Sequence, residues 1–394
     1  MVTQKTIERI QELCDEAVKS GFTAGVNVLA AVDGKEICYV QSGWSNIEKK
    51  IPIGRDTIFR LYSMSKPVTS AAAMILMERG MIDLADPVEE YLPGFRGQKV
   101  YEGTKTVPAW RGVMIRDLLS MTSGITYSGT ESQTEKDMEV LLDECRAKLG
   151  TGGEVSTVEL ANRVGQIPLA FQPGEHFQYG FSADIMGAII EVVTGMRFGD
   201  FLKKEIFDPL GMTDTGFSIS PDKADRLSAT YLQTAPGKLT EDPTNHLDVA
   251  AEPFSRPAFE SGGAGLLSTL PDYLKFGTML LNGGTFGGRR ILKEETVRFM
   301  TGAALFPCQQ ADIEKHWPGL MGYSYGNFLR TMKNPERALL YATKDEYGWD
   351  GWLGSFFSNH PAEKLTFLMG ISRENTGTTS LTRKVRNVLL ADLL

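Results

Sequence analysis

Strand-like sequence lies near both ends of this chain and is sparse in its middle. The stretch AGVNVLAAVDGKEICYVQSGWSN has two apolar runs around Asp33-Gly34, a dipeptide typical of a tight hairpin turn. Near the other end, SFFSNHP and LTFLMGISR have the pattern of adjacent antiparallel strands. Because a sheet must bury an apolar face, these segments predict one sheet made from both ends of the chain, with a mainly helical region inserted between them.

The remaining elements are expected to be mostly helices. The first 20 residues carry Ile7, Ile10, Leu13 and Ala17 at helical spacing, and RKVRNVLLADLL closes the chain as a helix. Residues 115–205 are expected to be largely helical, and the segment SADIMGAIIEVVTG within them has an apolar face made by Ile185, Ala188, Ile189, Val192 and Val193. Two stretches lack a clear pattern, so we expect a surface excursion at 126–157 and an irregular loop at 221–260.

This arrangement predicts two domains. Residues 1–75 and 260–394 form a discontinuous α/β domain, residues 76–259 form a mainly helical domain with loops, and the active site lies in the cleft between them. A chain of 394 residues is long enough for this division.

Composition and charge exclude several classes of function. A formal charge of -8 leaves no basic surface for nucleic acid, and no apolar run reaches the roughly 20 residues that span a bilayer. The first 20 residues lack the apolar core of a secretory signal, and the four cysteines are widely spaced. We therefore expect a cytoplasmic protein with reduced thiols. The four histidines show no metal-ligand spacing, so we expect no metal and no cofactor.

The stretch RLYSMSKPVTSAAAMI offers a candidate nucleophile and base. Pro67 is tolerated only in the first turn of a helix, so Ser63 is expected at or just before the helix start. Lys66 follows Ser63 by three residues, which places both side chains on one face. The helix dipole and burial both favour a neutral Lys66 amine that can accept the proton of Ser63. Taken alone, this spacing also occurs by chance on solvated helices.

The surrounding sequence resembles the serine β-lactamase and penicillin-binding protein superfamily. The resemblance is strongest to its class C-like branch, which includes family VIII carboxylesterases and D-amino-acid-specific peptidases. Matching segments follow in order along most of the chain: RLYSMSKPVTSAAAMILMERGMIDLADPV, IRDLLSMTSGI (115–125), PLAFQPGEHFQYGFSADIMGAIIEVVTG (168–195), FDPLGMTDTGF (207–217), SGGAGLLSTLPDYLKFGTMLLNGG (261–284), RRILKEETVRFM (289–300) and YGWDGWLGSFFSNHPAEKL (347–365). It implies a β-lactamase/transpeptidase-like fold, an antiparallel sheet flanked by helices with a mainly helical second region.

The resemblance also implies roles for individual residues. SxxK is the nucleophile motif of such enzymes. Tyr179 stands where the family has the Tyr of Tyr-x-Asn, so it would shuttle protons with Lys66, as a phenolate stabilised by cations. Trp349, Asp350 and Gly351 occupy the third motif and would contact the substrate. The backbone N–H groups of Ser63 and Trp352 would then bind the oxyanion. Without the resemblance, Tyr179 also fits a core ring, and Trp349 also fits an edge strand.

Two departures from the family pattern bear on the substrate. Phe181 replaces the Asn that binds a substrate amide, and Trp349 replaces the Lys that binds a β-lactam carboxylate. Loss of both polar anchors favours a carboxylesterase acting on small or medium acyl esters. Asp350 could instead attract a substrate ammonium, so a D-amino-acid peptidase, a carboxypeptidase or a weak β-lactamase stays open. The alternative of another class is a slowly acylating penicillin-binding sensor. The expected partner is a small ester or amide.

Overall fold

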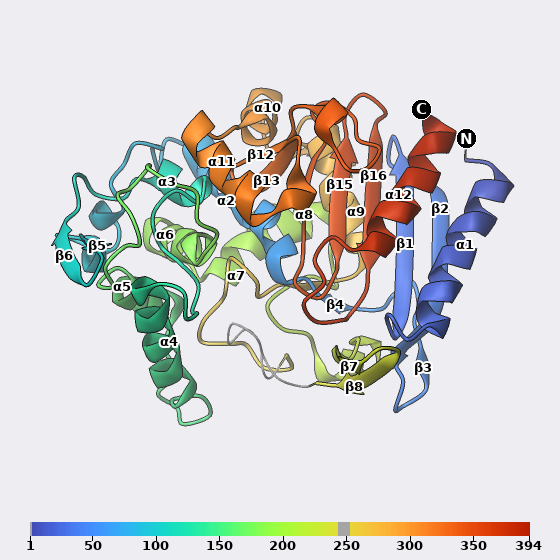
Figure 1. The fold of residues 1–394 in the computed structure, drawn as a ribbon, viewed down its shortest axis with the longest axis horizontal. Coiled ribbons are helices and arrows are strands. Elements are labelled where there is room, and N and C mark those ends of the chain that lie inside the picture. The colour runs from blue at the N-terminus through green and yellow to red at the C-terminus, as the bar shows by residue number, and fades with distance from the viewer. Residues whose placement is uncertain (1, 243–252) are drawn as a thin grey trace.

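The computed structural model describes residues 2–242 and 253–394 and is built around one antiparallel sheet (Figure 1). Its eight strands lie in the order β12 (Tyr323–Gly326), β13 (Leu329–Met332), β14 (Tyr347–Asp350), β15 (Phe356–His360), β16 (Leu365–Gly370), β1 (Gly25–Val32), β2 (Lys35–Asn46) and β3 (Ile51–Pro52). The two ends of the chain therefore meet in one sheet, as the sequence predicts.

The two halves of the sheet join where β1 pairs with β16. Ala30 lies opposite Phe367 in this antiparallel register. The hairpin between β1 and β2 turns at Asp33 and Gly34, whose φ angles of 52° and 72° are both left-handed. This conformation is the one that favours an Asp-Gly dipeptide in a two-residue hairpin turn, and the predicted hairpin is confirmed.

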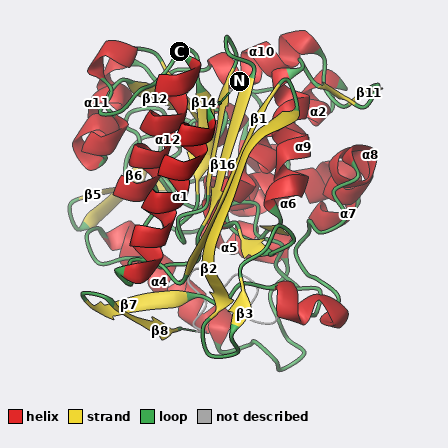
Figure 2. Ribbon diagram, turned by 90° about the vertical axis from the view of Figure 1, so that its right-hand side faces the viewer, coloured by secondary structure: helices red, strands yellow, loops and turns green. Residues whose placement is uncertain are grey.

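Helices cover both faces of the sheet (Figure 2). On one face, α1 (Gln4–Lys19) lies beside α12 (Ser380–Leu393), and Ile10 and Leu13 share a buried cluster with Val385 and Leu389. On the other face lie α9 (Leu270–Leu281) and α2 (Lys66–Glu78). The predicted fold class, an antiparallel sheet flanked by helices with a mainly helical second region, is confirmed.

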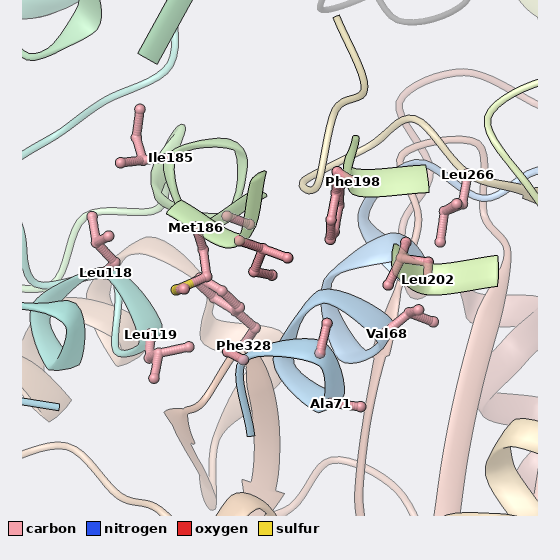
Figure 3. Close-up of a cluster of buried hydrophobic side chains, with 14 of the residues drawn as sticks. Val68, Ala71, Leu118, Leu119, Ile185, Met186, Phe198, Leu202, Leu266 and Phe328 are labelled. Atoms are coloured by element: carbon pink, nitrogen blue, oxygen red, sulfur yellow. The ribbon is translucent and has the colours of Figure 1, made fainter. Parts of the chain in front are cut away.

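The second region packs against α2 chiefly through α6. Its helices are α3 (Ile115–Leu119), α4 (Gln133–Arg146), α5 (Thr157–Val164), α6 (Ser182–Thr194), α7 (Phe198–Leu202) and α8 (Asp208–Leu210). Figure 3 shows Val68 and Ala71 of α2 in a buried cluster with Met186 of α6 and Leu202 of α7. The helix that carries Lys66 thus packs between the sheet and the helical region.

Short elements complete the chain. They are β4 (Phe59–Arg60) paired with β9 (Leu267–Ser268), the hairpins β5 (Lys99–Glu102) with β6 (Lys105–Pro108), β7 (Tyr231–Ala235) with β8 (Lys238–Glu241) and β10 (Thr285–Phe286) with β11 (Arg289–Arg290), and the helices α10 (Glu294–Gly302) and α11 (Pro307–His316). Among the described residues, no helix is long and apolar enough to cross a membrane.

Three sequence expectations need correction. The stretch 126–157 is more than a surface excursion, because it contains α4 with a Ser132 capping box at its start. The stretch 221–260 contains the β7–β8 hairpin, while residues 243–252 lie outside the described part. The apolar face of α6 ends earlier than expected, since Val192 is 42% exposed.

Candidate active site

The backbone before Ser63 adopts an unusual conformation. Residues Tyr62–Ser65 form a single 3-10 turn, and α2 then begins at Lys66 with Pro67 in its first turn. Tyr62 has a φ of 45°, a left-handed value that is strained for a bulky residue. Its ring packs 5.3 Å from the ring of Trp352. This packing holds the strained residue in place directly before the candidate nucleophile.

Lys66 is fully buried and contacts three oxygens. Its Nζ lies 3.1 Å from Ser63 Oγ, 3.0 Å from Tyr127 Oη and 2.8 Å from the carbonyl oxygen of Gly263. Burial lowers the pKa of Lys66 to about 7, although the carboxylates of Asp184 and Asp350 oppose this shift. The neutral amine is therefore accessible near neutral pH.

The three contacts match the bonding capacity of a neutral amine. A neutral amine has two N–H donors and one lone pair. The Gly263 carbonyl can only accept a hydrogen bond, and Tyr127 Oη can accept the second N–H. The lone pair is then left for the hydroxyl proton of Ser63. This geometry is compatible with a neutral Lys66 that accepts the proton of Ser63.

Tyr179 lies against both the nucleophile and the third motif. Its hydroxyl contacts the Ser63 side chain and accepts a hydrogen bond of 2.8 Å from Trp349 Nε1. Burial raises the pKa of Tyr179 far above its ordinary range, and the contacts of its oxygen with the Ser63 and Trp349 side chains only partly oppose the rise. Burial therefore favours the protonated phenol of Tyr179 over the phenolate expected from the sequence.

Tyr127 is a site residue that the sequence reasoning missed. It lies in the stretch expected to be a surface excursion, yet its hydroxyl contacts Lys66. Burial raises the pKa of this hydroxyl well above its ordinary value. No motif marks it, because its relevance depends only on the chain path after α3. Its ring meets Phe181 edge-on, with centroids 5.9 Å apart.

Phe181 does not occupy the place expected of a substrate contact. The side chain is 2% exposed and stacks on Phe259 with ring centroids 5.9 Å apart. It stands behind Tyr127 as part of the core. A phenyl ring at this position offers Lys66 no hydrogen bond, and the hydroxyl of Tyr127 supplies one.

Small residues bring the Gly263 carbonyl to Lys66. A side chain at Gly263 would place its Cβ 2.6 Å from Asp184 Oδ2, and one at Gly262 would overlap the Ala183 carbonyl. Asp184, at the start of α6, accepts hydrogen bonds from the Ser261 hydroxyl and from the Gly263 N–H, the latter at 3.1 Å. This network fixes the loop that carries the carbonyl.

The end of β14 approaches the nucleophile from the sheet. A Cβ on Gly351 would overlap the Leu61 carbonyl oxygen and Ser355 Oγ, so only glycine allows this approach. Ser355 Oγ also donates a hydrogen bond of 3.1 Å to that carbonyl. These contacts hold Trp352 beside the turn that bears Ser63.

Asp350 is already paired within the protein. Its Oδ2 accepts a hydrogen bond of 3.2 Å from Arg330 Nη1 and another from the Thr378 hydroxyl. Arg330 is 2% exposed, so it needs this carboxylate as a counter-charge. The pairing argues against Asp350 as a site for a substrate ammonium.

These residues open into a cavity of about 540 Å³. Most of the sequence-predicted site residues line it, namely Ser63, Tyr179, Trp349, Asp350, Gly351 and Trp352. Trp317, Pro318 and Leu320 add an apolar wall, and Thr376, Thr378 and Arg383 add a polar one. Lys66 lies beneath Ser63 and out of the lining. A mostly apolar pocket with a few polar groups suits a small organic substrate.

The fold and this Ser-Lys-Tyr arrangement are those of a serine β-lactamase-like protein, and comparison with known proteins agrees. Residues 10–391 match the Beta-lactamase family, to which the chain belongs. Protein Rv1367c of Mycobacterium tuberculosis is 31% identical over 91% of this chain and 87% of its own length. Esterase EstB of Burkholderia gladioli is 29% identical over 68% of each chain.

A solved structure shares the whole fold. EstCE1, described as a hydrolase with promiscuous acyltransferase activity, superimposes with a TM-score of 0.81 at 24% identity, covering 98% of both chains. The family and the esterase relative support hydrolysis as the general chemistry.

Proposed function

We propose that the protein is a serine carboxylesterase that forms a covalent acyl-enzyme on Ser63. The observation that carries this proposal is the 3.1 Å contact between Ser63 Oγ and a buried Lys66 amine whose pKa is about 7. A serine hydroxyl is a weak nucleophile until a neighbouring base takes its proton. Lys66 is such a base, and Ser63 faces the cavity.

In the first step, the Lys66 lone pair takes the proton from Ser63 Oγ as that oxygen attacks the ester carbonyl. The backbone N–H groups of Ser63 and Trp352, two residues that line the cavity, bind the developing oxyanion in this mechanism. One such donor stabilises a transition state by about 3 kcal/mol. Tyr62 and Gly351 keep the two segments that carry these donors close together.

In the second step, Tyr179 donates its proton to the departing alkoxide. Trp349 donates to the Tyr179 oxygen, so the Tyr179 proton is free to point into the reacting centre. The proton held by Lys66 then replaces the one that Tyr179 gives up. In deacylation, Tyr179 takes a proton from the attacking water as it passes its own proton to Lys66. Lys66 then returns a proton to Ser63 Oγ as the acid product is released.

An ester is the substrate that the cavity suits best. Trp317, Trp349 and Trp352 give it aromatic walls, and Trp349 stands where the related β-lactamases have a lysine for the substrate carboxylate. The Arg330 pairing argues against Asp350 as an ammonium site, which weakens the case for a D-amino-acid peptidase. These features support a neutral acyl or alcohol group.

A substrate panel tests the proposal. Wild-type protein should cleave p-nitrophenyl butyrate faster than nitrocefin or a D-alanyl amide, and Ser63→Ala should abolish the cleavage. Ser20→Ala, at the exposed end of α1, is a matched serine control and should keep full activity. Faster cleavage of the D-alanyl amide would replace the esterase assignment by a peptidase. A stable adduct without turnover would indicate a sensor.

A further inference from the structure

Trp317 forms one wall of the Ser63 cavity, directly after the end of α11. Its half-buried ring meets the ring of Tyr179 edge-on, with centroids 5.1 Å apart, and the ring of Trp349 with centroids 6.0 Å apart. Trp349 in turn donates its indole N–H to the Tyr179 oxygen. The three side chains thus form one aromatic cluster that includes the Tyr179 hydroxyl, and all three residues line the cavity.

α11 is tied to the segment that carries Tyr179. Asp312 of α11 accepts a hydrogen bond of 3.0 Å at Oδ2 from the backbone N–H of Phe177, which stands two residues before Tyr179. The ring of Phe177 also meets the Trp317 ring edge-on, with centroids 5.9 Å apart. These contacts hold Trp317 against Tyr179.

The proposed mechanism decides which half of the ester meets this cluster. In the tetrahedral intermediate, one carbon carries the Ser63 oxygen, the oxyanion, the alcohol oxygen and the acyl chain. The oxyanion lies at the backbone N–H groups of Ser63 and Trp352. The alcohol oxygen takes the proton of Tyr179, so it must lie within hydrogen-bond distance of that hydroxyl. The carbon attached to the alcohol oxygen then lies beside the rings of Trp349 and Trp317.

From this geometry we propose that the Ser63 site prefers esters of aromatic alcohols and that Trp317 determines this preference. The inference rests on the proposed esterase function and adds the class of alcohol to it. An aromatic ring on the alcohol can lie edge-on to the Trp317 indole, as the rings of Tyr179 and Trp349 already do. A saturated ring of similar size buries similar apolar surface but lacks the quadrupole that favours this geometry.

Hydrolysis of benzyl butyrate and of cyclohexylmethyl butyrate tests the proposal. The two esters share the acyl group and differ in whether the ring of the alcohol is aromatic or saturated. We expect Trp317→Leu to lower the ratio of their kcat/KM values, benzyl over cyclohexylmethyl, about fivefold relative to wild type, because leucine keeps an apolar wall but removes the ring. Comparing the ratio between proteins cancels the intrinsic reactivity of the esters, and measuring both esters on one sample cancels partial loss of folded protein.

Matched variants and a second substrate series locate the effect. Trp317→Phe keeps a ring and should retain most of the preference, whereas Trp110→Leu removes a 79% exposed indole outside the described lining and should leave the ratio unchanged. The series from ethyl acetate to ethyl octanoate varies only the acyl group, so Trp317→Leu should leave the shape of its chain-length profile unchanged. If Trp317→Leu does not fold, Trp317→Met replaces it, since methionine fills irregular space without a ring.

An unchanged ratio in Trp317→Leu would overturn the inference. So would a changed acyl-chain profile with an unchanged ratio, which would place the acyl group against Trp317. In both cases, cleavage that disappears in Ser63→Ala would leave the proposed esterase function standing. Cleavage of neither ester, or cleavage that Ser63→Ala retains in full, would instead overturn the proposed function and the inference with it.

Discussion

Lys66 Nζ lies 3.1 Å from Ser63 Oγ, one helical turn away and fully enclosed by the protein. Burial removes the water that would stabilise an ammonium ion, which makes the amine a base at neutral pH. The same distance on a solvated helix would leave a protonated lysine and an unreactive serine. The burial of Lys66 is therefore the feature that favours a catalytic over a chance interpretation of this SxxK spacing.

The pH dependence of ester hydrolysis should follow the protonation of Lys66. Since the pKa of Lys66 is lowered to about 7, the active neutral amine dominates above that pH and is lost as the pH falls through it. We expect kcat/KM to fall about tenfold per unit below pH 7 and to be level above it. A limb near pH 10 would mean that burial does not lower the pKa of Lys66.

Removing the Tyr127 hydroxyl should lower the pKa of Lys66 while leaving the Lys66 amine in place. The oxygen accepts a hydrogen bond from Nζ and so favours the charged amine. Tyr127→Phe is expected to lower kcat/KM roughly tenfold and to shift the pH limb below 7, because the ammonium loses a partner. Tyr101→Phe, which removes a distant hydroxyl bonded to Asp137, should change neither quantity.

Substitutions at Tyr179 and at Trp349 should lower kcat by unequal amounts. Tyr179→Phe removes the proton donor, and we expect kcat to fall about 10²- to 10⁴-fold. Trp349→Phe removes the 2.8 Å hydrogen bond to the Tyr179 oxygen and shrinks one aromatic wall of the cavity, but it leaves the proton donor in place, so the expected loss is about tenfold. Trp110→Phe is the control, since Trp110 is 79% exposed. Equal losses in the two site variants would contradict separate roles.

Gly351 should tolerate no side chain. A Cβ there overlaps the Leu61 carbonyl and Ser355 Oγ, so Gly351→Ala must push β14 away from the Ser63 turn. We expect a loss of about 1–3 kcal/mol in the free energy of unfolding, together with lower kcat. Gly302→Ala has open space around its Cβ and should be neutral in urea denaturation and in activity.

Asp350 should stabilise the folded protein through its ion pair with Arg330. Asp350→Asn leaves a buried guanidinium without its counter-charge, and the expected cost is about 3 kcal/mol in the free energy of unfolding. Adding Arg330→Met should recover part of that loss. A double variant whose two losses simply add would show that the pair is not coupled.

The fold could be predicted from the sequence because its signals are local. Asp33-Gly34 specifies a hairpin, Pro67 marks a helix start, and strand patterns occur at both ends of the chain. The nucleophile and its base are three residues apart, so one helical turn brings them together. The division at residues 75/76 and 259/260 stays a prediction.

The parts of the site that were missed depend on tertiary packing. Tyr127 and Lys66 are 61 residues apart, and no spacing rule connects them. The protonation state of Tyr179 follows from burial, which the motif does not report. Likewise, the pairing of Asp350 with Arg330 across neighbouring strands becomes visible only once the sheet is assembled.

Mass spectrometry of the intact protein, quenched during turnover of p-nitrophenyl butyrate, decides whether Ser63 carries the acyl group. We expect a mass increase equal to one butyryl group, located by peptide mapping on Ser63 and absent from Ser63→Ala. Hydrolysis that Ser63→Ala retains in full, or an adduct on another residue, would contradict the acyl-enzyme mechanism.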